Sequence, residues 1–157
     1  MRRVWILLVM LLLLSACGAA KPNRENQLPP SFTATIEGTR GETAFGAQLS
    51  VSSEERTIRY TAPEAIAGLT VTKTSTGISI RQGDFSAKNQ PEAAGFLAPL
   101  DLLLSPAELS SIEEQNGEKT LTYADGTKLI LQKGGTPRAV IGNDLFYTIS
   151  DFQTIAK

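Results

Sequence analysis

The side chains that most often carry out catalysis are nearly absent from this chain. It has no histidine and a single cysteine, Cys17, among its 157 residues. Without histidine there is no Ser-His or Cys-His nucleophilic pair, and the commonest zinc ligand is missing. One cysteine cannot form a disulfide within the chain. The chemistry left to Cys17 is that of a soft thiolate nucleophile, which can be alkylated.

Carboxylates are the remaining candidates for acid-base chemistry, because two of them can serve as the acid and the base of glycoside hydrolysis. The candidates are Glu54, Glu55, Asp84, Asp101, Glu113 and Glu114. Adjacent glutamates beside turns are usually solvated surface residues. No segment has the spacing of a calcium loop or of a phosphate-binding loop. We therefore expect no enzymatic activity, no metal site and no cofactor.

The N-terminal segment has the three parts of an export signal. Arg2 and Arg3 form a positive start, residues 4–14 are an almost unbroken apolar run, and the small residues Ser15 and Ala16 follow. A membrane-spanning helix needs about 20 apolar residues, and this run is shorter. We therefore predict a cleaved signal peptide over residues 1–16.

The segment Leu14-Ser15-Ala16-Cys17 resembles the lipobox of bacterial lipoproteins. The resemblance implies that the Cys17 thiol receives a diacylglycerol group, that acyl chains such as palmitate anchor the protein, and that Cys17 becomes the new N-terminus. The mature protein would then be held at the cell membrane or the outer membrane, facing outside the cytoplasm. Residues 17–31, which have no apolar period and three prolines, are predicted to be a flexible tether.

The charge of the chain argues against nucleic acid as a partner. Loss of Arg2 and Arg3 with the signal leaves 13 of the 15 basic side chains against 16 acidic ones, a formal charge of −3. The basic residues are scattered singly, whereas polyanion binding needs a clustered basic face. Residues 32–157 are long enough for one domain with a single core.

Most of this domain shows the alternation of apolar and polar residues that is typical of antiparallel strands with one buried face. Tight turns are predicted at Asp125-Gly126 and at residues 142–144, where the residue types tolerate a positive φ. The alternating segments are 32–36, 45–51, 58–60, 69–71, 78–80, 121–123, 129–131, 139–141 and 145–149.

Helical signals interrupt the strands at two places. Residues 63–68 begin with proline and end with glycine, which predicts one helical turn. Residues 99–104 have leucines at helical spacing after a proline. A second short helix is expected to start at Ser105, because Ser105 and Glu108 fit a capping box and Pro106 fits the first helical position.

The order of these elements resembles the LolA and LolB lipoprotein-carrier superfamily over residues 32–157. The resemblance rests on the step Tyr60-Thr61-Ala62-Pro63 into a helical turn, the start of the next strand at Gly68-Leu69, the helical insertion and a last hairpin that contains Pro137. It implies an α+β fold, in which a curved antiparallel sheet forms a half-barrel and short helices cover its concave face. It also implies an apolar cavity that accepts an acyl chain or another lipid.

The residues expected to line such a cavity are apolar side chains of the strands and of the helical insertion. They are Phe45, Leu49, Tyr60, Phe96, Leu100, Leu103 and Leu104. The alternative is that the same side chains fill a packed core. In that case the domain would be an envelope module that holds another protein through a sheet edge or a loop.

Overall fold

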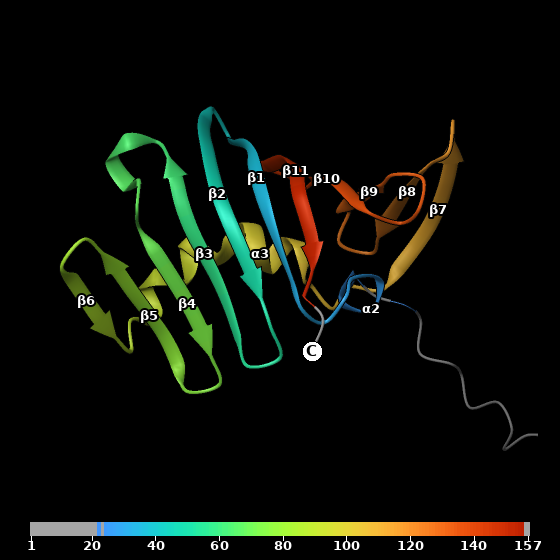
Figure 1. Cartoon of the computed structure of the whole chain (residues 1–157). Helices are drawn as coiled ribbons and strands as arrows, with labels where there is room; N and C mark the ends of the chain where they lie inside the picture. The colour runs from blue at the N-terminus through green and yellow to red at the C-terminus, as the bar shows by residue number, and fades with distance from the viewer. Residues whose placement is uncertain (1–21, 23, 156–157) are drawn as a thin grey trace, which may run out of the picture.

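The protein is described by a computed structural model, which covers Pro22 and residues 24–155. Cys17 and the predicted signal peptide 1–16 lie outside the described residues. Eleven strands form one antiparallel sheet in the order β6-β5-β4-β3-β2-β1-β11-β10-β9-β8-β7 (Figure 1). The strands are β1 (Phe32–Arg40), β2 (Thr43–Val51), β3 (Glu55–Ala62), β4 (Thr70–Thr74), β5 (Gly77–Gln82), β6 (Phe85–Lys88), β7 (Leu109–Gln115), β8 (Glu118–Tyr123), β9 (Lys128–Leu131), β10 (Pro137–Ile141) and β11 (Leu145–Thr154).

The alternating pattern of the sequence sets the inner face of this sheet. Along β1, Phe32, Ala34 and Ile36 are buried, and the residues between them face the other side. Successive side chains of a strand point to opposite faces, so the same alternation in the neighbouring strands collects one apolar layer. Each of the nine alternating segments coincides with a strand, except that Leu69 directly precedes β4, which confirms this part of the prediction.

The first and last strands meet in the middle of the sheet, where β1 pairs with both β2 and β11. Gly38 of β1 lies opposite Tyr147 of β11. A Cβ atom at position 38 would lie 2.0 Å from the carbonyl oxygen of Phe146 and 2.5 Å from Cα of Tyr147. Only glycine permits this approach, which brings the ring of Tyr147 into the core.

Helical residues are few. They form α2 (Arg24–Gln27), the 3-10 turns η1 (Glu64–Ile66) and η2 (Pro91–Leu97), and α3 (Ala98–Leu103), which continues η2. Figure 1 shows α3 behind the central strands. None of the described helices is long and apolar enough to cross a membrane.

The predicted α+β class with helices covering the concave face is therefore wrong. The sheet is antiparallel as expected, but it contains nearly all of the regular structure. One short segment, η2 with α3, packs on its inner face where a layer of helices was predicted. The helix predicted at residues 99–104 corresponds to α3, and the turn predicted at residues 63–68 corresponds to η1. The error was the expectation, taken from the resemblance, that helices would form a layer over the concave face.

The second helix predicted after Ser105 is also absent. The Ser105 hydroxyl accepts a hydrogen bond from the Ala107 amide, 3.3 Å away, and the chain then enters β7. The Leu109 amide donates to the carbonyl of Pro22, and the Ala124 amide donates to that of Glu108. Pairing with distant segments satisfies these backbone groups, and it overrides the local capping signal.

Candidate functional site

The centre of the inner face is filled by side chains that were candidates for a cavity lining. Leu49, Leu100 and Leu103 are 2 %, 1 % and 0 % exposed, and all three belong to the main hydrophobic core. The leucines of α3 point at the sheet because they recur at helical spacing, and Leu97 before them is buried in the same way. These residues stabilise the contact between α3 and the strands.

Beside this packed centre lies a pocket with a volume of about 250 Å³, which we call the aromatic pocket. The three aromatic residues among the predicted cavity residues, Phe45, Tyr60 and Phe96, line it. The structure brings them together from β2, β3 and η2. The lining is Arg40, Thr43, Phe45, Tyr60, Pro63, Ile66, Gly95, Phe96, Pro99 and Leu145.

Hydrogen bonds from two tyrosines hold η2 and the start of α3 over this pocket. The Tyr60 hydroxyl donates to the carbonyl of Phe96 at 2.6 Å, and the Tyr147 hydroxyl donates to the carbonyl of Pro99 at 2.8 Å. The Tyr60 ring meets the ring of Phe96 edge-on, with centroids 6.0 Å apart. Burial raises the pKa of Tyr60 to about 12. The hydroxyl therefore stays protonated, and keeps its hydrogen bond, at alkaline pH values near 10 where an exposed tyrosine would ionise.

Arg40 places an exposed guanidinium, paired with Asp144, at the rim of the aromatic pocket. Its Nη1 donates to the carbonyl of Gly95 at 3.3 Å, and its Nε lies 3.6 Å from a carboxylate oxygen of Asp144. The Arg40 side chain is 54 % exposed, so it remains open to solvent. An apolar pocket beside a cation suits an amphiphile with an anionic group. Sequence reasoning missed Arg40, because it ends a polar stretch before a turn and no local signal marks it.

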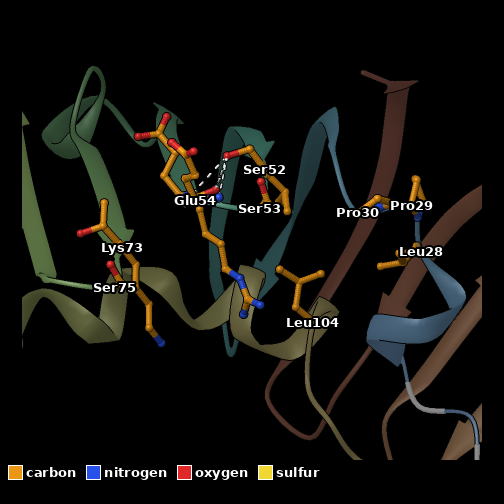
Figure 2. Close-up of a pocket in the computed structure, with 13 residues that line it drawn as sticks. Leu28, Pro29, Pro30, Ser52, Ser53, Glu54, Lys73, Ser75 and Leu104 are labelled. Atoms are coloured by element: carbon orange, nitrogen blue, oxygen red, sulfur yellow. Dashed lines mark hydrogen bonds between the residues drawn. The ribbon is translucent and has the colours of Figure 1, made fainter. Parts of the chain in front are cut away.

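A second, larger pocket of about 650 Å³ lies beside the end of α3, and we call it the proline pocket. Its apolar side is Leu28, Val51 and Leu104, the last of which was a sequence candidate. Figure 2 shows Leu104 facing the side chains of Leu28, Pro29 and Pro30 across the pocket. The remaining lining is polar and comes from the β2–β3 and β4–β5 turns, at residues 52–56 and 73–75.

The described part of the segment predicted as a tether packs on the sheet through Arg24. Its guanidinium donates to both carboxylate oxygens of Asp125, at 3.1 and 2.9 Å, and lies 4.7 Å from the ring centre of Tyr123. The Arg24 side chain is fully buried. Together with the hydrogen bond from Leu109 to Pro22, these contacts form what we call the N-terminal latch. Sequence reasoning missed it, because Arg24 and Asp125 are 101 residues apart.

The latch should make the stability of the fold sensitive to acid. The hydrogen bonds from Arg24 lower the pKa of Asp125 from 3.8 to about 2. A carboxyl group whose pKa is lower in the folded than in the unfolded protein stabilises the fold at pH values above its unfolded-state pKa. This stability is lost as the pH falls toward the folded-state pKa. The melting temperature should therefore drop between pH 3.8 and about 2, and Asp125→Asn should remove that part of the drop.

Circular dichroism melts at a series of pH values would measure this effect. Because the Asp125 carboxylate is 40 % exposed, solvent screening keeps the effect modest. Asp84→Asn, a neutralisation on an exposed turn, is the matched control and should leave the acid drop in place. If both variants follow the parent curve, the latch does not contribute to acid sensitivity.

Within the described residues, no three His, Cys, Asp or Glu side chains gather where they could hold a metal ion. The carboxylates considered for acid-base chemistry are dispersed. Glu54 and Glu55 line the proline pocket, whereas Asp101 is in α3 and Glu113 and Glu114 are in β7. Lys73 lies 3.7 Å from Asp101, and Lys119 lies 3.8 Å from Glu114.

No family model matches the chain, and no curated protein matches it. Among solved structures it is similar to an uncharacterized conserved protein from Thermus thermophilus, with a TM-score of 0.56 and 14% identity over 83% of this chain and 82% of that chain. A LolA superfamily protein from Nitrosomonas europaea aligns with a TM-score of 0.43 and 11% identity over 85% and 90% of the two chains. The first similarity shows a shared fold alone, and the second is too weak to carry an argument.

Proposed function

We propose that this protein is a lipoprotein, anchored through Cys17 in the cell membrane or the outer membrane, whose domain binds an apolar ligand such as an acyl chain in the cell envelope. The aromatic pocket is the observation that carries the ligand class. Its walls include Phe45, Ile66 and Phe96, and its rim carries the exposed guanidinium of Arg40 beside Asp144. An acyl chain with an anionic head would place its chain among the rings and its head beside the guanidinium.

The other support comes from the sequence. The segment Leu14-Ser15-Ala16-Cys17 resembles a lipobox, and an anchor at Cys17 would hold the domain beside a source of acyl chains. The resemblance of the element order to the LolA and LolB carriers indicates the same class of ligand. Since the chain has no histidine and the proposed anchor would occupy its one cysteine, the proposed role is binding and not catalysis.

The variant Thr43→Trp tests the aromatic pocket. Thr43 lines the mouth of the pocket, and a Trp there would fill it without disturbing the central core. We expect the affinity of residues 18–157 for a fluorescent fatty acid to fall by about tenfold, a loss of about 1.4 kcal/mol. Fluorescence titration would measure the dissociation constant.

Thr39→Trp is the matched control. It adds the same side chain on β1 at an exposed position of the opposite face, and it should leave fatty-acid binding within about twofold of the parent. Equal binding by Thr43→Trp and the parent would show that the aromatic pocket is not the site. Failure of the parent to take up the probe would reject the apolar-ligand function.

The packed centre of the inner face supports a second candidate function. Because Leu49, Leu100 and Leu103 are buried in the core, the domain is also suited to a stable module that holds another envelope protein. Native mass spectrometry of the purified full chain distinguishes the two candidate functions. A co-purifying lipid supports ligand binding, and a lipid-free protein in a stable complex with a second protein supports the interaction module.

A further inference from the structure

We propose that the outer face of the sheet, opposite α3, binds an acidic polysaccharide through Arg59 and Arg81. This site is separate from both inner pockets, and the proposal does not depend on the apolar-ligand function. It starts from the register of seven neighbouring strands. Directly paired residues form what we call the arginine row, which is Ser150, Thr35, Gln48, Arg59, Thr70, Arg81 and Ser86.

The members of the arginine row share one face of the sheet, because residues directly opposite in antiparallel strands point the same way. The neighbouring chain positions Leu49, Ile58 and Val71 are buried on the inner face. A second row lies two residues away along each strand and is also polar. We call it the hydroxyl row, which is Thr33, Ser50, Thr57, Thr72, Ser79 and Lys88.

Neither row contains a carboxylate, although the chain has 16 acidic residues. Members of both rows line a groove of about 450 Å³ on this face, together with Asp151 and Gln153 from β11. Thr57 and Thr72 hydroxyls in the hydroxyl row lie 3.0 Å apart and hydrogen-bond. The groove therefore offers hydroxyl and amide groups on most of its length and one carboxylate at its β11 side.

The lining of this groove includes two basic side chains, Arg59 and Arg81. In the part of the chain that the structure describes, no carboxylate pairs with Arg59 or Arg81, and both side chains are exposed. They flank Thr70 from β3 and β5, which places them about 10 Å apart at the usual strand spacing. Two exposed guanidinium groups on one face give this part of the groove a local positive potential. An anionic ligand across Thr70 would meet both of them.

The chemistry of the rows favours a sugar polymer over other polyanions. Hydroxyl and amide side chains both donate and accept hydrogen bonds, as sugar hydroxyls do, and guanidinium groups bind carboxylates through two parallel hydrogen bonds. Neither row has an aromatic side chain on which nucleic-acid bases could stack. Neither row has an apolar side chain that could enter a membrane. The ligand that fits is a polysaccharide with carboxylate groups.

Fluorescein-labelled decagalacturonate is a defined probe of this chemistry. The full chain, purified in a polyoxyethylene detergent, should raise its fluorescence anisotropy. Dextran of the same length and a ten-nucleotide oligothymidylate should bind at least about tenfold more weakly, since one lacks the carboxylates and the other lacks the sugar hydroxyls. Equal binding of dextran or of the oligonucleotide would overturn the proposal, as would no binding of decagalacturonate.

Variants of the arginine row test whether decagalacturonate binds there. Arg59→Gln with Arg81→Gln should weaken decagalacturonate binding by about tenfold or more, and the control pair Lys128→Gln with Lys133→Gln on another part of the surface should change it by less than about twofold. If the arginine pair binds as the parent does, the proposal fails. Uptake of a fatty acid should be unchanged in the arginine pair, which keeps this test independent of the aromatic pocket.

Thr70→Glu separates loss of binding from loss of folding. It places a carboxylate between the two arginines, which should preserve or raise the melting temperature and lower decagalacturonate affinity to the level of the arginine pair. Thr70→Gln, of nearly the same size and without charge, should bind like the parent. If Thr70→Glu keeps its melting temperature and binds like the parent, the arginines do not hold the ligand.

Discussion

Replacing Leu103 by Ala should lower the free energy of unfolding by about 2–5 kcal/mol, the full cost of a buried leucine. Leu103 is 0 % exposed and joins α3 to the core of the sheet. The surrounding strands are held in register on both sides and cannot collapse into the space that the side chain leaves. Urea unfolding, followed by circular dichroism, would give the value. Tryptophan fluorescence would not, because the only Trp is Trp5 in the predicted signal.

Leu102→Ala is the control for this experiment. Leu102 is the neighbouring residue of α3 and loses the same atoms, but it is only partly buried, at the edge of the core. Its replacement should cost clearly less than that of Leu103. If the two variants lose the same small amount of stability, the space around Leu103 is open and the centre of the inner face is a cavity after all.

Replacing Cys17 by Ser should abolish incorporation of lipid. The expected acylation forms a thioether at the Cys17 sulfur, and a hydroxyl is too weak a nucleophile to replace the thiolate. Metabolic labelling with an alkyne analogue of palmitate should therefore mark the parent and leave the variant unmarked. The variant should also leave the membrane fraction or accumulate as unprocessed precursor, because its acyl anchor is missing.

The labelling experiment has a built-in control, since Cys17 is the only cysteine of the chain. Adding Ser53→Cys to the Cys17→Ser variant restores a thiol on an exposed turn without restoring the lipobox. This double variant should remain unlabelled. Equal labelling of the parent and the Cys17→Ser variant would refute the predicted anchor and the proposed location together.

The sequence predicts the strands in which apolar and polar residues alternate strongly. It does not predict the strands in which this alternation is weak. The segment of β1 that begins at Phe32 was evident because every second side chain enters the core. The strands β6 and β7 were missed because nearly all of their side chains are exposed, so neither has an apolar face to reveal it. The helix expected after Ser105 failed for a related reason, since its backbone groups pair with segments that local signals cannot identify.

The candidate site could be predicted in part. Phe45, Tyr60 and Phe96 do meet around one pocket, but Leu49, Leu100 and Leu103 pack in the core beside it. Residue type alone does not distinguish a side chain that lines a pocket from one that fills the interior. The difference depends on the positions of η2 and α3, which are held by hydrogen bonds from Tyr60 and Tyr147 to backbone carbonyls far along the chain. The polar rows of the outer face likewise depend on register.

The N-terminal latch limits how far the domain of an anchored protein can lie from the lipid surface. Seven Cα-to-Cα steps lead from Cys17 to Arg24, and a chain of that length spans at most about 25 Å, whatever its conformation. With the anchor proposed for Cys17, the end of the sheet near Asp125 would stay within that distance of the lipid surface. Exchange of an acyl chain would then be restricted to the membrane that carries the anchor, because the latch leaves too little chain to reach across to another.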